Sequence, residues 1–174
     1  MAGTAGSLLG RALYTGPSLA TLQERYAKGG IIDDRAPVLA SCQVHVSAPP
    51  ARVWQLLSGL ADWPAWVPGV TSVRLGPGGC VPDEPFRWKL NGMSIRSTLA
   101  VVAPERELCW TGLLAGTRAV HRFRLAPTAD GGTEVHSEES IGGPLISLYF
   151  GSDKLEKVLH DWLVALKTTS EEQS

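Results

Sequence analysis

A histidine and a carboxylate stand in apolar phases of two neighbouring predicted strands. His121 lies in the alternating run 119–125, and Glu139 lies in the alternating run 135–141. Both positions share the phase of the residues that should face a protein interior. An unpaired buried carboxylate is strongly unfavourable, so Glu139 should be paired, protonated or hydrated. We expect His121 to be its partner, either directly opposite or offset by two residues.

Such a pair could perform acid–base chemistry. A histidine oriented by a carboxylate can remove a proton next to a carbonyl group, or protonate a ketone during aldol closure and dehydration. Such a pair can equally be a satisfied polar contact that fixes the register of two strands. His121 and Glu139 are therefore the candidate catalytic residues, with a structural role as the open alternative.

The strands that must position this pair begin with a hairpin around Asn91-Gly92, a strong two-residue turn signal. Alternating apolar residues on both sides of the turn should share a concave face, and Arg87 should lie opposite Arg96 on the other face. The predicted concave pairs are Leu90 with Met93, Trp88 with Ile95 and Phe86 with Ser97.

The next two strands carry the concave face towards His121. Alternation predicts that Leu108, Trp110 and Gly112 pair inward with Val101, Leu99 and Ser97, respectively. A hairpin through residues 114–117 should then return Ala119, His121, Phe123 and Leu125 along Trp110. Trp110 and His121 are thus predicted neighbours. Arg122 and Arg124 should face outward, towards acidic residues of the last strand.

A long amphipathic helix is predicted from Leu145 to Lys167. Apolar residues recur there at intervals of three and four. At about 1.5 Å per residue, such a helix can lie along the whole concavity of a curved sheet. Leu148, Leu155, Leu159 and Trp162 are expected to face the sheet.

The segment Ser47 to Val70, SAPPARVWQLLSGLADWPAWVPGV, links the first strand to the rest. Pro49-Pro50 ends a strand and suits the first turn of a helix, while Pro64 and Pro68 bracket Trp66 at a reversal of the chain. This run resembles the START-like, Bet v 1-like superfamily of polyketide cyclases/dehydrases and lipid-transport proteins. The resemblance covers residues 38 to about 167.

The element order and the resemblance together predict an α+β helix-grip fold. A curved antiparallel sheet of about seven strands should wrap a long C-terminal helix, with two short helices after the first strand. The predicted divisions are an N-terminal extension with one helix (1–37), a START-like ligand-binding domain (38–167) and a polar tail (168–174). The extension's helix, 14–28, should pack outside the domain or act as a lid or dimer contact.

Composition restricts the possible partners. The net charge is −1 and 44% of residues are hydrophobic, which gives no general field for nucleic acid. Cys42, Cys80 and Cys109 have no paired spacing and fit reduced thiols in a cytoplasmic protein. No apolar run is long enough for membrane integration. We therefore expect no nucleic acid, no integral membrane association, no metal and no cofactor, in a monomer or homodimer.

A curved sheet closed by one helix can leave an internal pocket, and the resemblance strengthens that reading. We expect a hydrophobic or aromatic small-molecule ligand. The function suggested by the resemblance is a polyketide cyclase/dehydrase of secondary metabolism, by metal-free aldol-type ring closure. A non-catalytic lipid or hydrophobic-ligand carrier or sensor is the alternative, and a protein adaptor ranks third. The predicted ligand-binding residues are Trp66, Phe86, Trp88, Ile95, Ser97, Leu99, Trp110, Ala119, Phe123, Ser137, Leu155 and Leu159.

Overall fold

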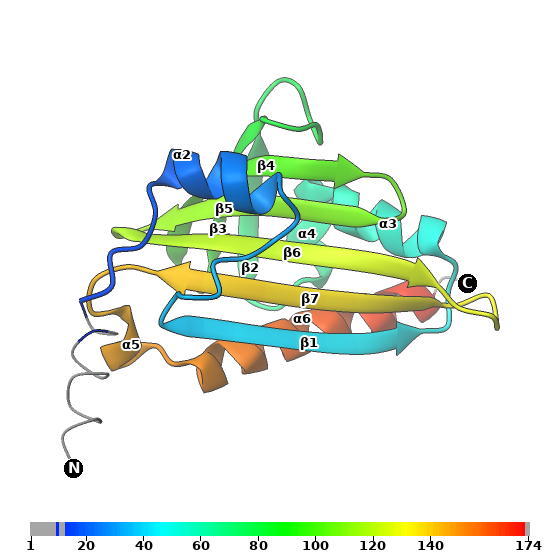
Figure 1. Cartoon of the computed structure of the whole chain (residues 1–174). Coiled ribbons are helices and arrows are strands. Elements are labelled where there is room, and N and C mark those ends of the chain that lie inside the picture. Colours follow the sequence, from blue (N-terminus) through cyan, green and yellow to red (C-terminus); the bar gives the residue numbers. More distant parts are fainter. Residues whose placement is uncertain (1–9, 11–12, 173–174) are drawn as a thin grey trace, which may run out of the picture.

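A computed structural model describes residue 10 and residues 13–172 of the chain. Its sheet has seven antiparallel strands in the order β1-β7-β6-β5-β4-β3-β2 (Figure 1). The strands are β1 (Val38–Val46), β2 (Val70–Leu75), β3 (Pro85–Leu90), β4 (Met93–Ala103), β5 (Glu107–Leu114), β6 (Thr117–Pro127) and β7 (Thr133–Gly142). The predicted extension and tail include residues 1–9, 11–12 and 173–174, which lie outside the described part.

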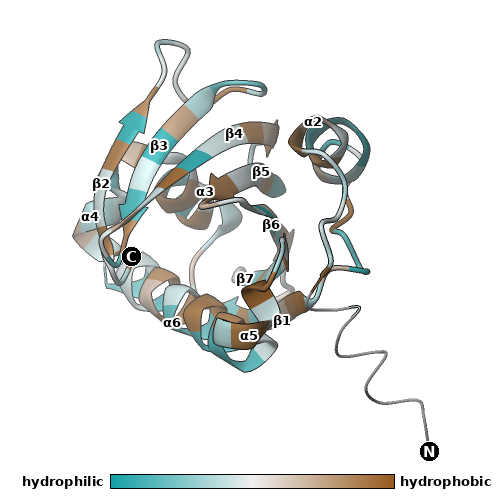
Figure 2. Cartoon of the chain, turned by 90° about the vertical axis from the view of Figure 1, so that its left-hand side faces the viewer, coloured by the Kyte–Doolittle hydropathy of each residue, from teal (hydrophilic) through white to brown (hydrophobic). Residues whose placement is uncertain are grey.

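The helices occupy both faces of this sheet. They are α2 (Leu19–Thr21), η1 (Leu22–Ala27), α3 (Pro50–Ser58), η2 (Leu60–Asp62), α4 (Trp63–Trp66), α5 (Ile146–Tyr149) and α6 (Ser152–Glu171). Viewed from the end, the sheet curves around the side on which α6 lies, whereas α2 lies on its outer side (Figure 2). The predicted helix-grip fold is confirmed.

The hairpin between β3 and β4 has the predicted register. Asn91 and Gly92 have φ angles of 50° and 80°, as a two-residue turn of this kind requires. The three predicted concave pairs are all formed, and Arg87 lies opposite Arg96. Met93, however, is 47% exposed and does not join the core. It directly follows the turn, beyond the cover of the helices.

A β-bulge in β4 corrects one predicted pairing. Gly112 pairs with Ser97 and Trp110 with Leu99, as expected, but Leu108 pairs with Val102. The register shifts between Leu99 and Val101, so that an extra residue enters β4. Val101 therefore lies opposite Cys109 and packs in the outer cluster, and its predicted inward position was wrong.

The predicted helix from Leu145 to Lys167 is two helices. Phe150 and Gly151 adopt extended conformations between α5 and α6, which interrupts the helical hydrogen bonding. As a result, Leu148 is 70% exposed, against its predicted inward position. Leu155, Leu159 and Trp162 do face the sheet and are buried. Helix α6 continues to Glu171, four residues beyond the predicted end of the domain.

The N-terminal segment packs on the convex face of the sheet. Its helical part begins at Leu19 instead of Tyr14, because Gly16 has a φ of 64° and Ser18 caps the first turn. Leu22 and Ala27 bury against three residues of the strands, Ala100, Cys109 and Val120. The segment therefore packs on the outside of the domain, and its role as a dimer contact stays a prediction.

Gln23 anchors this segment through its side chain. Its amide nitrogen donates to the carbonyl oxygen of Leu99 at 2.9 Å, and its amide oxygen accepts from the hydroxyl of Thr111 at 2.7 Å. The backbone N–H of Asp83 also donates to the Leu99 carbonyl. Gln23 thus contributes a hydrogen bond at the β4 bulge, where ladder pairing is interrupted.

Candidate functional site

His121 and Glu139 lie directly opposite each other on β6 and β7. Nδ1 of His121 is 3.5 Å from Oε2 of Glu139. The predicted partnership is therefore present in the structure. Ala40 of β1 lies opposite Glu139 on the other side, and Trp110 of β5 lies opposite His121. The pair thus lies on two adjacent strands of the concave face, between β1 at the edge of the sheet and β5 at its centre.

His121 is enclosed on nearly every side. Its side chain is 3% exposed, and the centroid of its ring lies 4.6 Å from Trp110, 4.7 Å from Phe123 and 5.4 Å from Trp162. Its Nε2 is 3.0 Å from Oγ of Ser137, which is itself fully buried. Ser137, His121 and Glu139 therefore form a continuous polar chain through an apolar interior.

Burial sets the charge state of this chain. It lowers the pKa of His121 to about 3, because the imidazolium form loses its hydration. It raises the pKa of Glu139 to about 8, because the carboxylate form also loses hydration. Both groups are consequently neutral at pH 7, and Glu139 carries the acidic proton.

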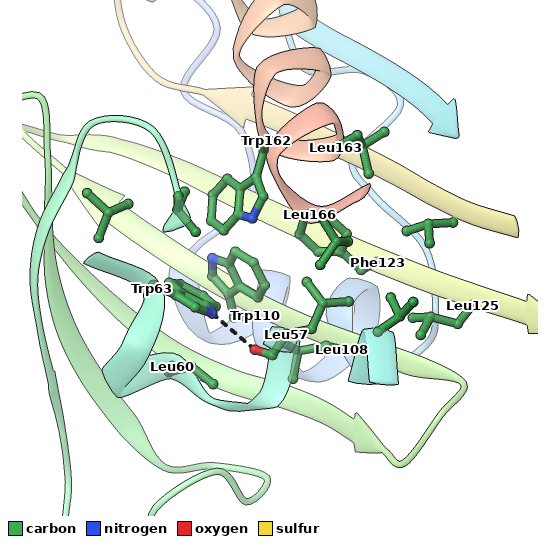
Figure 3. Close-up of a cluster of buried hydrophobic side chains, with 14 of the residues drawn as sticks. Leu57, Leu60, Trp63, Leu108, Trp110, Phe123, Leu125, Trp162, Leu163 and Leu166 are labelled. Carbon is green, nitrogen blue, oxygen red and sulfur yellow. Dashed lines mark hydrogen bonds between the residues drawn. The ribbon is translucent and has the colours of Figure 1, made fainter. Parts of the chain in front are cut away.

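Aromatic side chains, among them Trp63, Trp110 and Trp162, gather in the interior (Figure 3). Two of these rings, Trp110 and Trp162, contact the ring of His121. Trp63 makes ring contacts with Phe86, Trp88, Trp110 and Trp162 at centroid distances of 5.2 to 6.0 Å. Its indole N–H donates to the carbonyl of Leu57 at 3.1 Å. The predicted walls Phe86, Trp88, Trp110 and Phe123 are at most 5% exposed and contact other rings of this cluster. Their contact with a ligand stays a prediction.

Trp63 was missed among the site residues. It is fully buried and central to the cluster, whereas the predicted Trp66 at the end of α4 is half-buried. The sequence contained a usable signal, because Leu57, Leu60 and Trp63 recur at intervals of three, which is typical of one helical face.

Small residues lie on the other side of the His121–Glu139 pair. Ser97, Gly112 and Ala119 are adjacent across β4, β5 and β6. A β-carbon added at Gly112 would lie 3.6 to 3.8 Å from Ser97, Ile95 and Ala119, so these side chains share the concave face. Ile95 and Ala119 are partly exposed, in contrast to the aromatic cluster.

The remaining predicted ligand contacts belong to the core. Leu99 of β4 and Leu159 of α6 are fully buried, and Leu155 is 2% exposed. Leu155 and Leu159 pack with Val38, Ile146 and partly buried side chains of β1 and β7. The structure therefore brings together His121, Glu139 and Ser137, while most other predicted contacts build the surrounding packing.

Among the described residues, no group of three or more histidine, cysteine, aspartate or glutamate side chains could hold a metal ion. The described helices also include none that is both long and apolar enough to cross a membrane.

An open groove of about 660 Å³ lies outside the sheet, between the N-terminal segment and β6–β7, where Tyr26, Arg122 and Glu138 line it. It is separate from the His121–Glu139 pair.

Comparison with known proteins identifies the family. Residues 38–171 match the family model described as polyketide cyclase / dehydrase and lipid transport. The chain belongs to this family. The match begins at the first residue of β1 and ends at the last residue of α6, so it covers the whole helix-grip unit. A search of curated proteins finds no match.

Solved structures share the fold of this polyketide cyclase/dehydrase and lipid-transport family member. The hypothetical protein jhp0584 of Helicobacter pylori has a TM-score of 0.70 and 14% identity, over 79% of this chain and 90% of that one. A START superfamily protein from Mycobacterium smegmatis has a TM-score of 0.62 and 15% identity, over 78% and 99%. DynU16, from the dynemicin biosynthetic locus, has a TM-score of 0.61 and 17% identity, over 76% and 47%.

Proposed function

We propose that this protein binds a hydrophobic or aromatic small molecule on the concave face of its sheet and acts on it as a polyketide cyclase/dehydrase. The observation that carries the proposal is the buried His121–Glu139 pair, with Nδ1 and Oε2 3.5 Å apart. It lies beside the small residues Gly112 and Ala119. A neutral acid–imidazole pair in an apolar site can transfer protons at pH 7, because the site has already excluded the water that would otherwise hydrate the two groups.

The family and the fold support the ligand class. The family description includes both polyketide cyclization and lipid transport, and both involve largely apolar molecules. The similarity to DynU16, described as a protein of a biosynthetic locus, is compatible with secondary metabolism. We propose ring closure or dehydration at a carbonyl-bearing substrate, without a metal or cofactor, in the cytoplasm.

A non-catalytic carrier or sensor is the second candidate. It is favoured by the extent of ring packing around His121, which lies among Trp110, Phe123 and Trp162. In that case the His121–Glu139 contact fixes strand register, and the ligand is bound and released unchanged. Binding alone would then account for the apolar interior.

The test begins with native mass spectrometry of the protein purified from its host, which would reveal a co-purified ligand. Turnover of that compound is then measured in the parent, in Glu139→Gln and in His121→Ala. Loss of an acid–base group should lower turnover by about 100-fold or more while binding persists. Glu134→Gln, on the other face of β7, is the matched control. Full turnover in both site variants would exclude the catalytic pair, and binding without parental turnover would favour the carrier.

A further inference from the structure

Both ring nitrogens of His121 already have partners in the protein. Nε2 lies 3.0 Å from Ser137 Oγ, and Nδ1 lies 3.5 Å from Glu139 Oε2. The imidazole is also covered by aromatic rings on several sides, including Trp110 and Phe123. A ligand would have to displace one of these partners to reach either nitrogen. His121 is therefore poorly placed to touch a substrate.

Glu139 is the reachable end of the polar chain. Its side chain is 15% exposed, five times the exposed fraction of the His121 side chain. The neighbouring concave residues Ala40, Ala119 and Ile141 are partly exposed as well. Solvent, and by extension a ligand, thus approaches the chain from the Glu139 side, next to the small residues.

Among the described residues, no charged side chain contributes to the shifted pKa of Glu139, which burial alone raises. His121 on β6 faces it, and burial keeps the imidazole neutral. On β1, Cys42 lies opposite the adjacent inward residue Ser137, and the pKa of its thiol is raised by burial and by Glu156 of α6. Burial is the cause of the raised pKa of Glu139. The carboxyl group is thus protonated at pH 7 and can donate a hydrogen bond.

We infer that Glu139, and not His121, meets the ligand, as a neutral carboxyl group that donates to a carbonyl oxygen of an apolar, ring-bearing molecule. This inference rests on the proposed function, since it assigns the ligand chemistry of the same site. His121 and Ser137 are positioning residues. In this arrangement the Ser137 hydroxyl is taken as the donor to Nε2, so that the N–H of His121 lies on Nδ1, 3.5 Å from Oε2 of Glu139.

The proton balance of a dehydration closes with Glu139 alone. In a β-hydroxy ketone, the hydroxyl takes the place of the carbonyl oxygen as the acceptor for Glu139. In one concerted step the Glu139 proton passes to this hydroxyl, the C–O bond breaks to release water, and the other Glu139 oxygen, stabilised by the Nδ1–H of His121, removes the proton next to the carbonyl as the C=C bond forms. Glu139 ends the cycle protonated, and no co-reactant is needed.

The ligand chemistry is tested with two probes of the same shape, 2-acetylnaphthalene and 2-isopropenylnaphthalene. Their Kd values are measured by quenching of tryptophan fluorescence in the parent, Glu139→Gln and Glu139→Leu. One hydrogen bond should favour the ketone by roughly fivefold in the parent and in Glu139→Gln, relative to Glu139→Leu. At pH 9 the parent should lose this preference and Glu139→Gln should keep it. An equal ratio of Kd values in all three proteins would overturn the inference.

A ligand-free measurement separates this inference from the proposed function. Carbon-13 NMR can follow the carboxyl of Glu139, assigned by its absence in Glu139→Gln. A titration midpoint near 8 supports the inference, and one near 4.5 overturns it, whatever either probe does.

Ser137→Ala should raise the midpoint, because the N–H of His121 is no longer held towards the carboxylate. An unchanged midpoint would contradict the positioning role of Ser137. Failure of both probes to bind the parent would instead count against the proposed function.

Discussion

The indole N–H of Trp88 donates to Oγ of Ser97 at 3.0 Å, from β3 to β4 across the concave face. Trp88 is 5% exposed, so this bond satisfies a polar group that would otherwise be buried without a partner. Ser97 therefore supports the aromatic cluster, although its small size suggested open space. Gly112 and Ala119, which pair with each other across β5 and β6, remain as the small residues near the His121–Glu139 pair.

Enlarging Ala119 should block ligand binding without unfolding the protein. In Ala119→Phe the added ring would occupy the partly exposed side of the concave face, next to Gly112. We expect binding of an apolar fluorophore to fall by tenfold or more, on the order of 1.4 kcal/mol. Arg96→Phe, on the outer face of β4, is the control. Unchanged fluorophore affinity in Ala119→Phe would place the binding site elsewhere.

Replacing Leu159 with aspartate should unfold the protein or strongly destabilise it. Leu159 is fully buried against the sheet, and the variant would place an unpaired charge there. The expected loss of unfolding free energy is about 4 kcal/mol or more, measured by urea denaturation. Leu148→Asp is the matched control, because Leu148 is 70% exposed and its substitution should change stability by less than about 0.5 kcal/mol. Similar losses in both variants would contradict the separation of α5 from α6.

Gln23→Ala should loosen the N-terminal segment from the sheet. It removes the hydrogen bonds to Leu99 and Thr111 and leaves the Thr111 hydroxyl without its partner in a buried site, while the Leu99 carbonyl keeps the N–H of Asp83. We expect a loss of about 1–3 kcal/mol in unfolding free energy, together with faster proteolysis of the segment. Arg25→Ala, an exposed neighbour, should have little effect on either measurement. Parental stability in Gln23→Ala would show that the other contacts of the segment, including the Lys28–Asp83 ion pair, are sufficient to hold it.

Stability should fall as the pH rises from 6.5 to 8. Folded Glu139 keeps its proton up to a pKa of about 8, whereas the unfolded chain loses it near 4.5. The folded state therefore binds more protons in this range, and raising the pH favours unfolding. His121 acts in the opposite direction below its unfolded pKa of 6.5, so the two effects offset each other from about 4.5 to 6.5.

Above pH 6.5 only the Glu139 effect remains, and it amounts to about 2 kcal/mol by pH 8. Urea denaturation of the parent and of Glu139→Gln at both pH values isolates it, because other titrating groups are common to the two proteins. The parent should lose this additional stability, and the variant should not. An identical pH dependence would mean that Glu139 ionises normally in the folded protein.

Local sequence patterns were sufficient to predict which residues of the strands around the site share a face. The period of two in β6 and β7 predicted that His121 and Glu139 share one face of adjoining strands, opposite each other or offset by two residues, and the structure shows them opposite. Asn91-Gly92 predicted the register of the β3–β4 hairpin. These features depend on neighbouring residues and short turns, so alternation and turn chemistry specify them. The pattern failed at the bulge after Leu99, because one inserted residue changes the face of those that follow.

Only the tertiary structure decided which member of the polar chain is accessible. The sequence placed His121 as the acting group and Glu139 as its support, but exposure depends on how Trp110, Phe123 and Trp162 converge from three separate elements. Likewise, periodicity could not detect that Phe150-Gly151 separates α5 from α6, since apolar residues recur at helical spacing on both sides of the break. Sequence determines which residues face inward, whereas long-range packing determines which of them remain within reach of a ligand.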